Sequence, residues 1–235
     1  MDTDSRPGEI RFRIGSIPVI IQPYFWLTAV ILSGGWFNAE PRPWPIFTFI
    51  LACFLSILLH ELGHAWMGKL FGARYIHIVL TGLGGFASGA NTNPHWWQRI
   101  LVTLAGPGIQ LVLAGLLHFL LFETAVFSNE NQVVTLFALQ LYTISLFWAL
   151  INLIPIYPLD GGQVALEILQ KATPSQSEKL SALLSIALCI GLLYYIYNHQ
   201  QSMFNMILVG MLAVQNLERL QRASARPDDD SRWRE

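Results

Sequence analysis

The sequence predicts an all-α polytopic membrane protein with about six transmembrane helices and a short re-entrant or β-like element between the second and third. Hydrophobic residues make up 53% of the 235 residues and charged residues only 12%, about half the charged share of a soluble domain. So few charges cannot cover a surface in water, so we expect the lipid bilayer as solvent. Six apolar segments approach the roughly 20 residues that span a bilayer as a helix. They are residues 17–37, 44–67, 100–122, 133–156, 180–197 and 202–218.

The basic residues support this division of the chain. When the flanks and loops are assigned to alternating sides, thirteen of the fourteen Lys and Arg residues fall on one side and only Arg42 on the other. The positive-inside rule then predicts six passes with both termini in the cytoplasm. The net charge of −1 gives no reason to expect a nucleic-acid partner.

The polar ends and loops complete the predicted organisation. The stretch IRFRIGSIPVII before the first segment alternates partly and indicates a short extended lead-in. The loop GARYIHIVLTGLGGFASGANTNPHWW is β-branched and then glycine-rich, so it predicts a strand or hairpin at the interface or buried in protein. We expect one membrane-embedded domain over residues 1–220 and a polar, disordered cytoplasmic tail over 221–235.

The stretch SILLHELGHAW places two histidines and a glutamate inside the second apolar segment. Residues four apart share a helix face, so His60 and His64 can bind one metal ion with two imidazoles. Glu61 can then take a proton from a metal-bound water, as in the HExxH pattern of zinc sites. A charge at the centre of a membrane helix costs about 2.5–3.5 kcal/mol. This cost favours a functional site over the alternative, hydrogen bonds between helices.

Two histidines leave such a site short of a ligand, since catalytic zinc commonly has three protein ligands and a water. The second and fourth segments run in the same direction, and Asp160 ends the fourth. We therefore expect Asp160 at the depth of His60 and His64, near the cytoplasmic side. Asn152 lies eight residues earlier. Its amide could donate to a developing oxyanion or bond a backbone carbonyl freed by the broken helix, and both alternatives remain open.

Three motifs together resemble the site-2 protease family of intramembrane metalloproteases. They are HELGH, LAGPGIQL and NLIPIYPLDGGQ, within a match over residues 14–170. The resemblance implies a three-helix catalytic core over about residues 44–165, with metal ligands His60, His64 and Asp160, general base Glu61, and Asn152 near substrate or oxyanion. It also implies that extended backbone beside the GLGGFASG loop receives unwound substrate as an added strand. Family members often carry asparagine where this chain has Gln110.

The function expected is that of an intramembrane endopeptidase with one zinc ion per chain, cutting within or near transmembrane helices of other proteins. Its partners would be the lipid bilayer, a membrane-protein substrate and a regulatory membrane protein, while the sequence leaves the oligomeric state open. A metal transporter is one alternative, although the outer halves of segments two and four carry almost no polar residues for a path. A scaffold that binds membrane helices is the other, but it has no evident use for Glu61.

Overall fold

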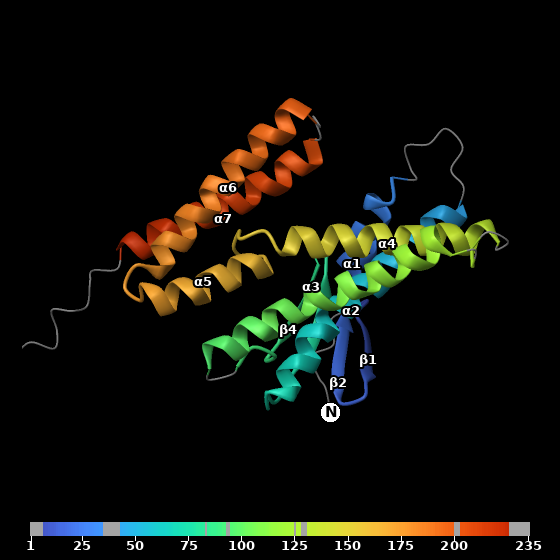
Figure 1. Ribbon diagram of the computed structural model, residues 1–235, viewed down its shortest axis with the longest axis horizontal. Helices are drawn as coiled ribbons and strands as arrows, with labels where there is room; N and C mark the ends of the chain where they lie inside the picture. Colours follow the sequence, from blue (N-terminus) through green and yellow to red (C-terminus); the bar gives the residue numbers. More distant parts are fainter. Residues whose placement is uncertain are drawn as a thin grey trace, which may run out of the picture. The chain divides into compact units, whose positions relative to one another are not determined.

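The computed structural model describes most of the chain as helices with one small sheet (Figure 1). It forms two compact units, Met1–Leu150 and Ile151–Glu235. The prediction of a single domain stays a prediction. The described residues are 7–34, 43–82, 84–92, 95–124, 126–127, 131–199 and 203–225.

A four-stranded sheet lies in the first unit, in the order β1-β2-β3-β4. Its strands are β1 (Ile10–Ile14), β2 (Ile17–Ile21), β3 (His77–Thr81) and β4 (Gly84–Ser88). The pairs β1–β2 and β3–β4 are antiparallel hairpins, whereas β2 and β3 pair in parallel with Val19 opposite Ile78. The predicted lead-in and the predicted loop element are therefore two halves of one sheet.

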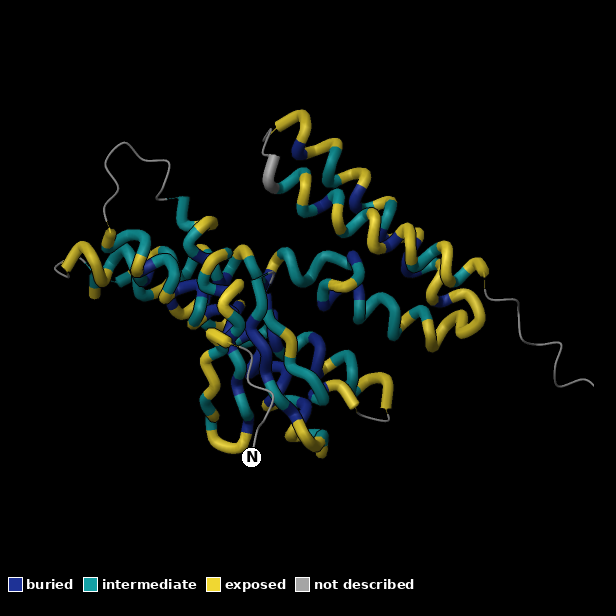
Figure 2. Tube along the Cα trace, turned by 180° about the vertical axis from the view of Figure 1, so that it is seen from behind, coloured by how far each residue is buried: buried dark blue, intermediate teal, exposed yellow. Residues whose placement is uncertain are grey.

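One face of this sheet forms the core of the first unit. Alternate residues of β2 are buried because successive side chains of a strand point to opposite faces, and Ile17, Val19 and Ile21 share the inner one. They join Ile78 and Leu80 of β3 in a cluster that includes residues of α2. Figure 2 shows the buried residues gathered along the sheet and the middle of α2.

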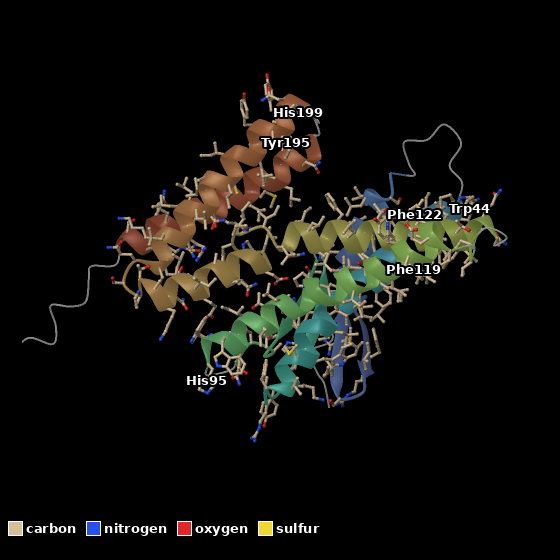
Figure 3. All side chains as sticks on the ribbon, viewed as in Figure 1. Trp44, His95, Phe119, Phe122, Tyr195 and His199 are labelled. Carbon is tan, nitrogen blue, oxygen red and sulfur yellow. The ribbon has the colours of Figure 1, made fainter. Side chains whose placement is uncertain are left out.

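The helices of the first unit are α1 (Pro23–Leu32), α2 (Pro43–Leu70), α3 (Trp96–His118) and most of α4 (Gln132–Asn152). A π-helical turn, η2 (Phe119–Glu123), extends α3. α2 packs against α3 and contacts β3 and β4. The α2–α3 pair carries Trp44, Phe119 and Phe122 at one end and His95 at the other (Figure 3), as expected of helices whose aromatic side chains anchor at an interface.

The second unit contains α5 (Asp160–Ala172), α6 (Ser177–His199) and α7 (Met203–Ala225). α6 and α7 lie side by side, and α5 packs against α6 (Figures 1 and 2). A small core joins Ile156, Cys189, Ile196 and Val209. The rest of the α6–α7 pair is largely exposed or half-buried, and apolar side chains such as Ile190 and Ile207 are among its exposed residues.

The fold class is confirmed, with two adjustments to the predicted spans. Four described helices are long and apolar enough to cross a membrane: α2, α3 with η2, α4 and α6. Segment 17–37 is instead β2 followed by the ten-residue helix α1, because Pro18 and Pro23 prevent one continuous helix. Segment 202–218 falls on α7, which is not among those four. α7 continues to Ala225, inside the predicted tail, and residues 226–235 lie outside the described chain.

Candidate metal centre

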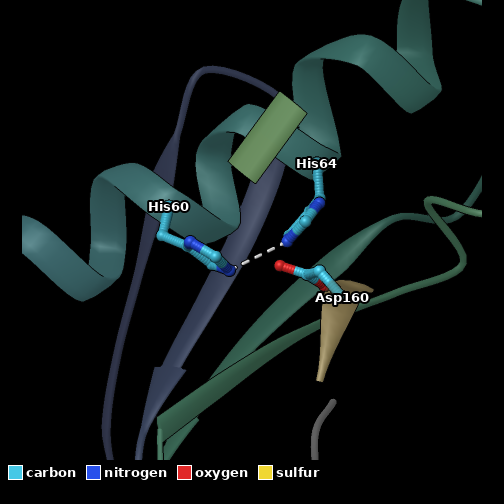
Figure 4. A group of neighbouring side chains, drawn as sticks. All are labelled: His60, His64 and Asp160. Atoms are coloured by element: carbon cyan, nitrogen blue, oxygen red, sulfur yellow. Dashed lines mark hydrogen bonds between the residues drawn. The ribbon is translucent and has the colours of Figure 1, made fainter. Parts of the chain in front are cut away.

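The two histidines of the HELGH stretch meet on one face of α2. Their Nε2 atoms are 3.0 Å apart, joined by the dashed line in Figure 4. The ring centroids are 4.6 Å apart and the ring planes are nearly perpendicular, at 84°. Both residues are buried. This is the convergence expected of side chains one helical turn apart.

The opposite edge of each ring contacts an oxygen. His60 Nδ1 is 2.8 Å from Gln110 Oε1, and His64 Nδ1 is 2.8 Å from the carbonyl oxygen of Val102. Both oxygens accept hydrogen bonds, so both Nδ1 atoms donate, and in the tautomer with its proton on Nδ1 each ring has its Nε2 lone pair toward the other. Facing lone pairs repel each other unless a cation lies between them. Two nitrogens on one tetrahedral zinc are roughly 3.3 Å apart, from bonds of about 2.0–2.1 Å, so the donor set fits zinc.

α2 and α3 pack closely here. The His64 ring fits between them only because α3 has a glycine at position 106. A Cβ atom at Gly106 would overlap the His64 ring. Gly106 is in the AGP motif, directly before Pro107. The motif therefore provides the space that the His64 ring occupies. The carbonyl of Val102 on the same helix fixes the orientation of that ring.

Glu61 is buried beside the histidines, 4% exposed. Strand β4 passes over it, and a Cβ atom built on Gly85 would lie 2.7 Å from Glu61 Cγ. The glycine thus lets the strand backbone approach the carboxyl group closely. Because β4 is the last strand in the sheet order, Glu61 lies beneath an edge strand.

Asn152 and Asp160 lie on either side of a turn in the second unit. Asn152 is the last residue of α4, and Asp160 is the first residue of α5 and is buried. Between them, both the N–H and the carbonyl of Tyr157 form hydrogen bonds with side chains. Its N–H donates to Ser185 Oγ of α6 at 3.0 Å, and its carbonyl accepts from Asn216 Nδ2 of α7 at 2.6 Å.

Sequence reasoning missed the polar residues behind His60. Gln110 is completely buried, as are Ser56 and Ser145. The signal in the sequence is weak, because each is a single polar residue in an apolar helix and Gln110 stands out only as a departure from the family asparagine.

Asp160 is drawn as sticks with the two histidines in Figure 4.

The HExxH histidine pair lies inside an apolar helix, and its donor set suits zinc. The sequence model of Peptidase family M50 matches residues 48–193. Since this match covers more than half of the chain, the protein belongs to that family.

Individual relatives agree with this assignment. A zinc metalloprotease of Methanocaldococcus jannaschii is 31% identical over 161 residues, 68% of this chain and 45% of the relative. Stage IV sporulation protein FB of Bacillus subtilis is 27% identical over 177 residues, 74% of this chain and 56% of the relative. This chain therefore spans about half the length of these relatives.

A solved structure shares the fold. The site-2 protease from Methanocaldococcus jannaschii superposes with a TM-score of 0.62 and 23% sequence identity, covering 90% of this chain and 95% of that one. The helices and the small sheet thus form the architecture of that protein.

Proposed function

We propose that this protein is a zinc-dependent endopeptidase that cuts other membrane proteins within or near their transmembrane helices. The observation that carries the proposal is the pair of facing histidine nitrogens, 3.0 Å apart, next to a buried glutamate in an apolar helix. A buried carboxyl group has no packing advantage there and costs insertion energy, so it is best explained by chemistry.

The proposed ligands are His60 and His64 from the first unit and Asp160 from the second. Asp160 has the right chemistry, because an Asp or Glu oxygen commonly completes a two-histidine zinc site. Its position in the NLIPIYPLDGGQ motif supports the same role. Bound zinc would polarise the scissile carbonyl and make a water nucleophilic near neutral pH.

Glu61 is proposed as the general base. It is one residue from His60 on α2, and its carboxylate can accept a proton from the attacking water and later donate that proton to the leaving amine. Asn152 is proposed to donate its amide N–H to the oxygen that gains negative charge when water attacks the carbonyl.

A substrate helix must unwind first, because its own hydrogen bonds hide the scissile peptide. The edge strand β4 offers a place for the opened chain, since an extended segment can pair with an edge strand through main-chain hydrogen bonds. Gly85 brings β4 close to Glu61, so a segment added along this strand would pass near the proposed base. The basic residues of the loops support a site that opens toward the cytoplasm, with both termini on that side.

The proposal can be tested before any substrate is identified. Wild type and Glu61→Gln would be expressed in one host, and new protein N-termini in the membrane fraction would be mapped by mass spectrometry. We expect termini inside or beside transmembrane segments with wild type and none of these with Glu61→Gln, while both proteins retain zinc. Identical sets of termini from the two proteins would refute the peptidase function.

A further inference from the structure

The hydrogen bonds of Gln110 fix which end of its amide faces His60. Gln110 Nε2 lies 3.1 Å from the carbonyl oxygen of Ser56, and a carbonyl can only accept. The nitrogen must therefore point to Ser56, which leaves Oε1 toward His60 Nδ1 at 2.8 Å. The ring nitrogen must then carry the proton and donate it. The structure thus determines the His60 tautomer from a backbone carbonyl one turn away on the same helix.

The second amide proton continues the network. Gln110 Nε2 also lies 2.9 Å from Ser56 Oγ, and Ser56 Oγ lies 3.0 Å from Ser145 Oγ of α4. Gln110, Ser56 and Ser145 are all completely buried, so no water competes for these bonds. The network runs through three helices, α4, α2 and α3, and ends on the histidine ring.

We propose that Gln110 is a positioning residue that holds His60 with Nε2 free of a proton and aimed at the metal. Without its oxygen, a neutral His60 can move its proton to Nε2 and donate it to His64 Nε2, which would close the space between the histidines. With it, the proton stays on the far edge of the ring. Ser56 and Ser145 act behind Gln110 by preventing its amide from rotating.

Partners that orient a ligand histidine in this way commonly change metal affinity by about 10–100-fold when they are removed. A glutamine side chain is one methylene longer than the asparagine often found in the family. In this chain the added length lets one side chain of α3 reach both Ser56 and His60 of α2. The inference rests on the proposed function only in taking His60 as a zinc ligand.

The test compares zinc affinity, measured by competition with a chelator, in purified wild type, Gln110→Met and Gln110→Glu. Gln110→Met keeps the length but removes the oxygen, and we expect zinc to bind about 10–100-fold more weakly. Gln110→Glu retains an oxygen toward His60 Nδ1, so it is expected to recover most of that loss. The absorption spectrum of the cobalt-substituted protein would report the changed ligand field in Gln110→Met.

Gln140→Met is the matched control. Gln140 of α4 also donates from its amide to a carbonyl of α2, that of Pro45, at 3.2 Å. Pro45 lies fifteen residues before His60, so this variant loses an interhelical hydrogen bond far from the histidines. We expect wild-type zinc affinity and an unchanged cobalt spectrum.

Equal zinc affinity in wild type and Gln110→Met would overturn the inference, as would an equal loss in Gln140→Met, which would indicate general weakening of the bundle. If Gln110→Met does not fold, Gln110→Leu replaces it. Like Gln110→Met, this variant has no oxygen beside His60 Nδ1, and an unaltered affinity and cobalt spectrum would overturn the inference too. Both outcomes leave zinc bound to wild type, whereas a folded wild type without zinc would refute the proposed function itself.

Discussion

The two units stabilise their proposed metal ligands by different means. In the first unit, hydrogen bonds to the histidine rings themselves fix their orientation. The acceptors are the amide oxygen of Gln110 and the carbonyl oxygen of Val102. In the second, hydrogen bonds to the backbone hold the turn that leads to Asp160. Ser185 and Asn216 bind the N–H and carbonyl of Tyr157, three residues before the aspartate.

The difference follows from the side chains involved. A histidine ring can rotate and carry its proton on either nitrogen, so a ligand histidine needs a partner that selects one orientation and one tautomer. An aspartate is short, and either carboxylate oxygen can bind a metal. Its position is therefore set mainly by where the backbone places its Cα atom. Side-chain bonds are needed for the first kind of ligand and backbone bonds for the second.

The largest expected effect comes from removing one ligand in each unit. His64→Ala and Asp160→Ala should each reduce zinc from about one ion per chain to a small fraction, because a two-ligand site holds zinc weakly. Metal content of the purified, folded proteins would be measured by atomic emission. His118→Ala, on α3, is the control and should keep its zinc. Full zinc in Asp160→Ala would show that the second unit contributes no ligand.

Much of the first unit's chemistry could be predicted from sequence, because HELGH is a local pattern on one helix and needs only the i, i+4 spacing. The sheet could be predicted only in pieces. Val19 and Ile78 pair in parallel, although they are far apart in the sequence, and no local alternation specifies that pairing. Gln110 was similarly beyond prediction, since which α3 residue faces His60 depends on how two helices pack.

Gly106→Ala tests whether zinc binding depends on the space that Gly106 leaves for the His64 ring. The added methyl group would overlap the His64 ring, and overpacking of this kind costs about 1–3 kcal/mol of stability. We expect weaker zinc binding, measured by chelator competition, with a lower unfolding temperature. Gly108→Ala is the control on the same helix, where a Cβ meets no atom within 4 Å. Equal behaviour of the two variants would show that the space at position 106 is not required.

Asn216→Leu tests the backbone support of the second unit. It removes the donor to the Tyr157 carbonyl while keeping the branching at Cγ, and the loss should cost about 0.5–2 kcal/mol. Zinc should bind several-fold more weakly, because the turn before Asp160 loses one of the two hydrogen bonds to the Tyr157 backbone. Asn198→Leu removes a bond from an exposed asparagine to a carbonyl one turn back on α6, and should leave zinc affinity unchanged. An equal loss of zinc affinity in both variants would show that the loss does not come from the hydrogen bond to Tyr157.

Arg219 supports the same turn from outside, and its removal should have the smallest effect. Its guanidinium lies 3.6 Å from the centre of the Tyr157 ring, a contact with an aromatic face that contributes about 0.5–1 kcal/mol. It also pairs with Glu178 at 2.6 Å, but the Glu178 side chain is 49% exposed, so that ion pair adds little. Thermal unfolding should therefore show a small loss in Arg219→Met and almost none in Glu178→Gln. An equal loss in both would assign the stabilisation to the ion pair with Glu178 rather than to the contact with the Tyr157 ring.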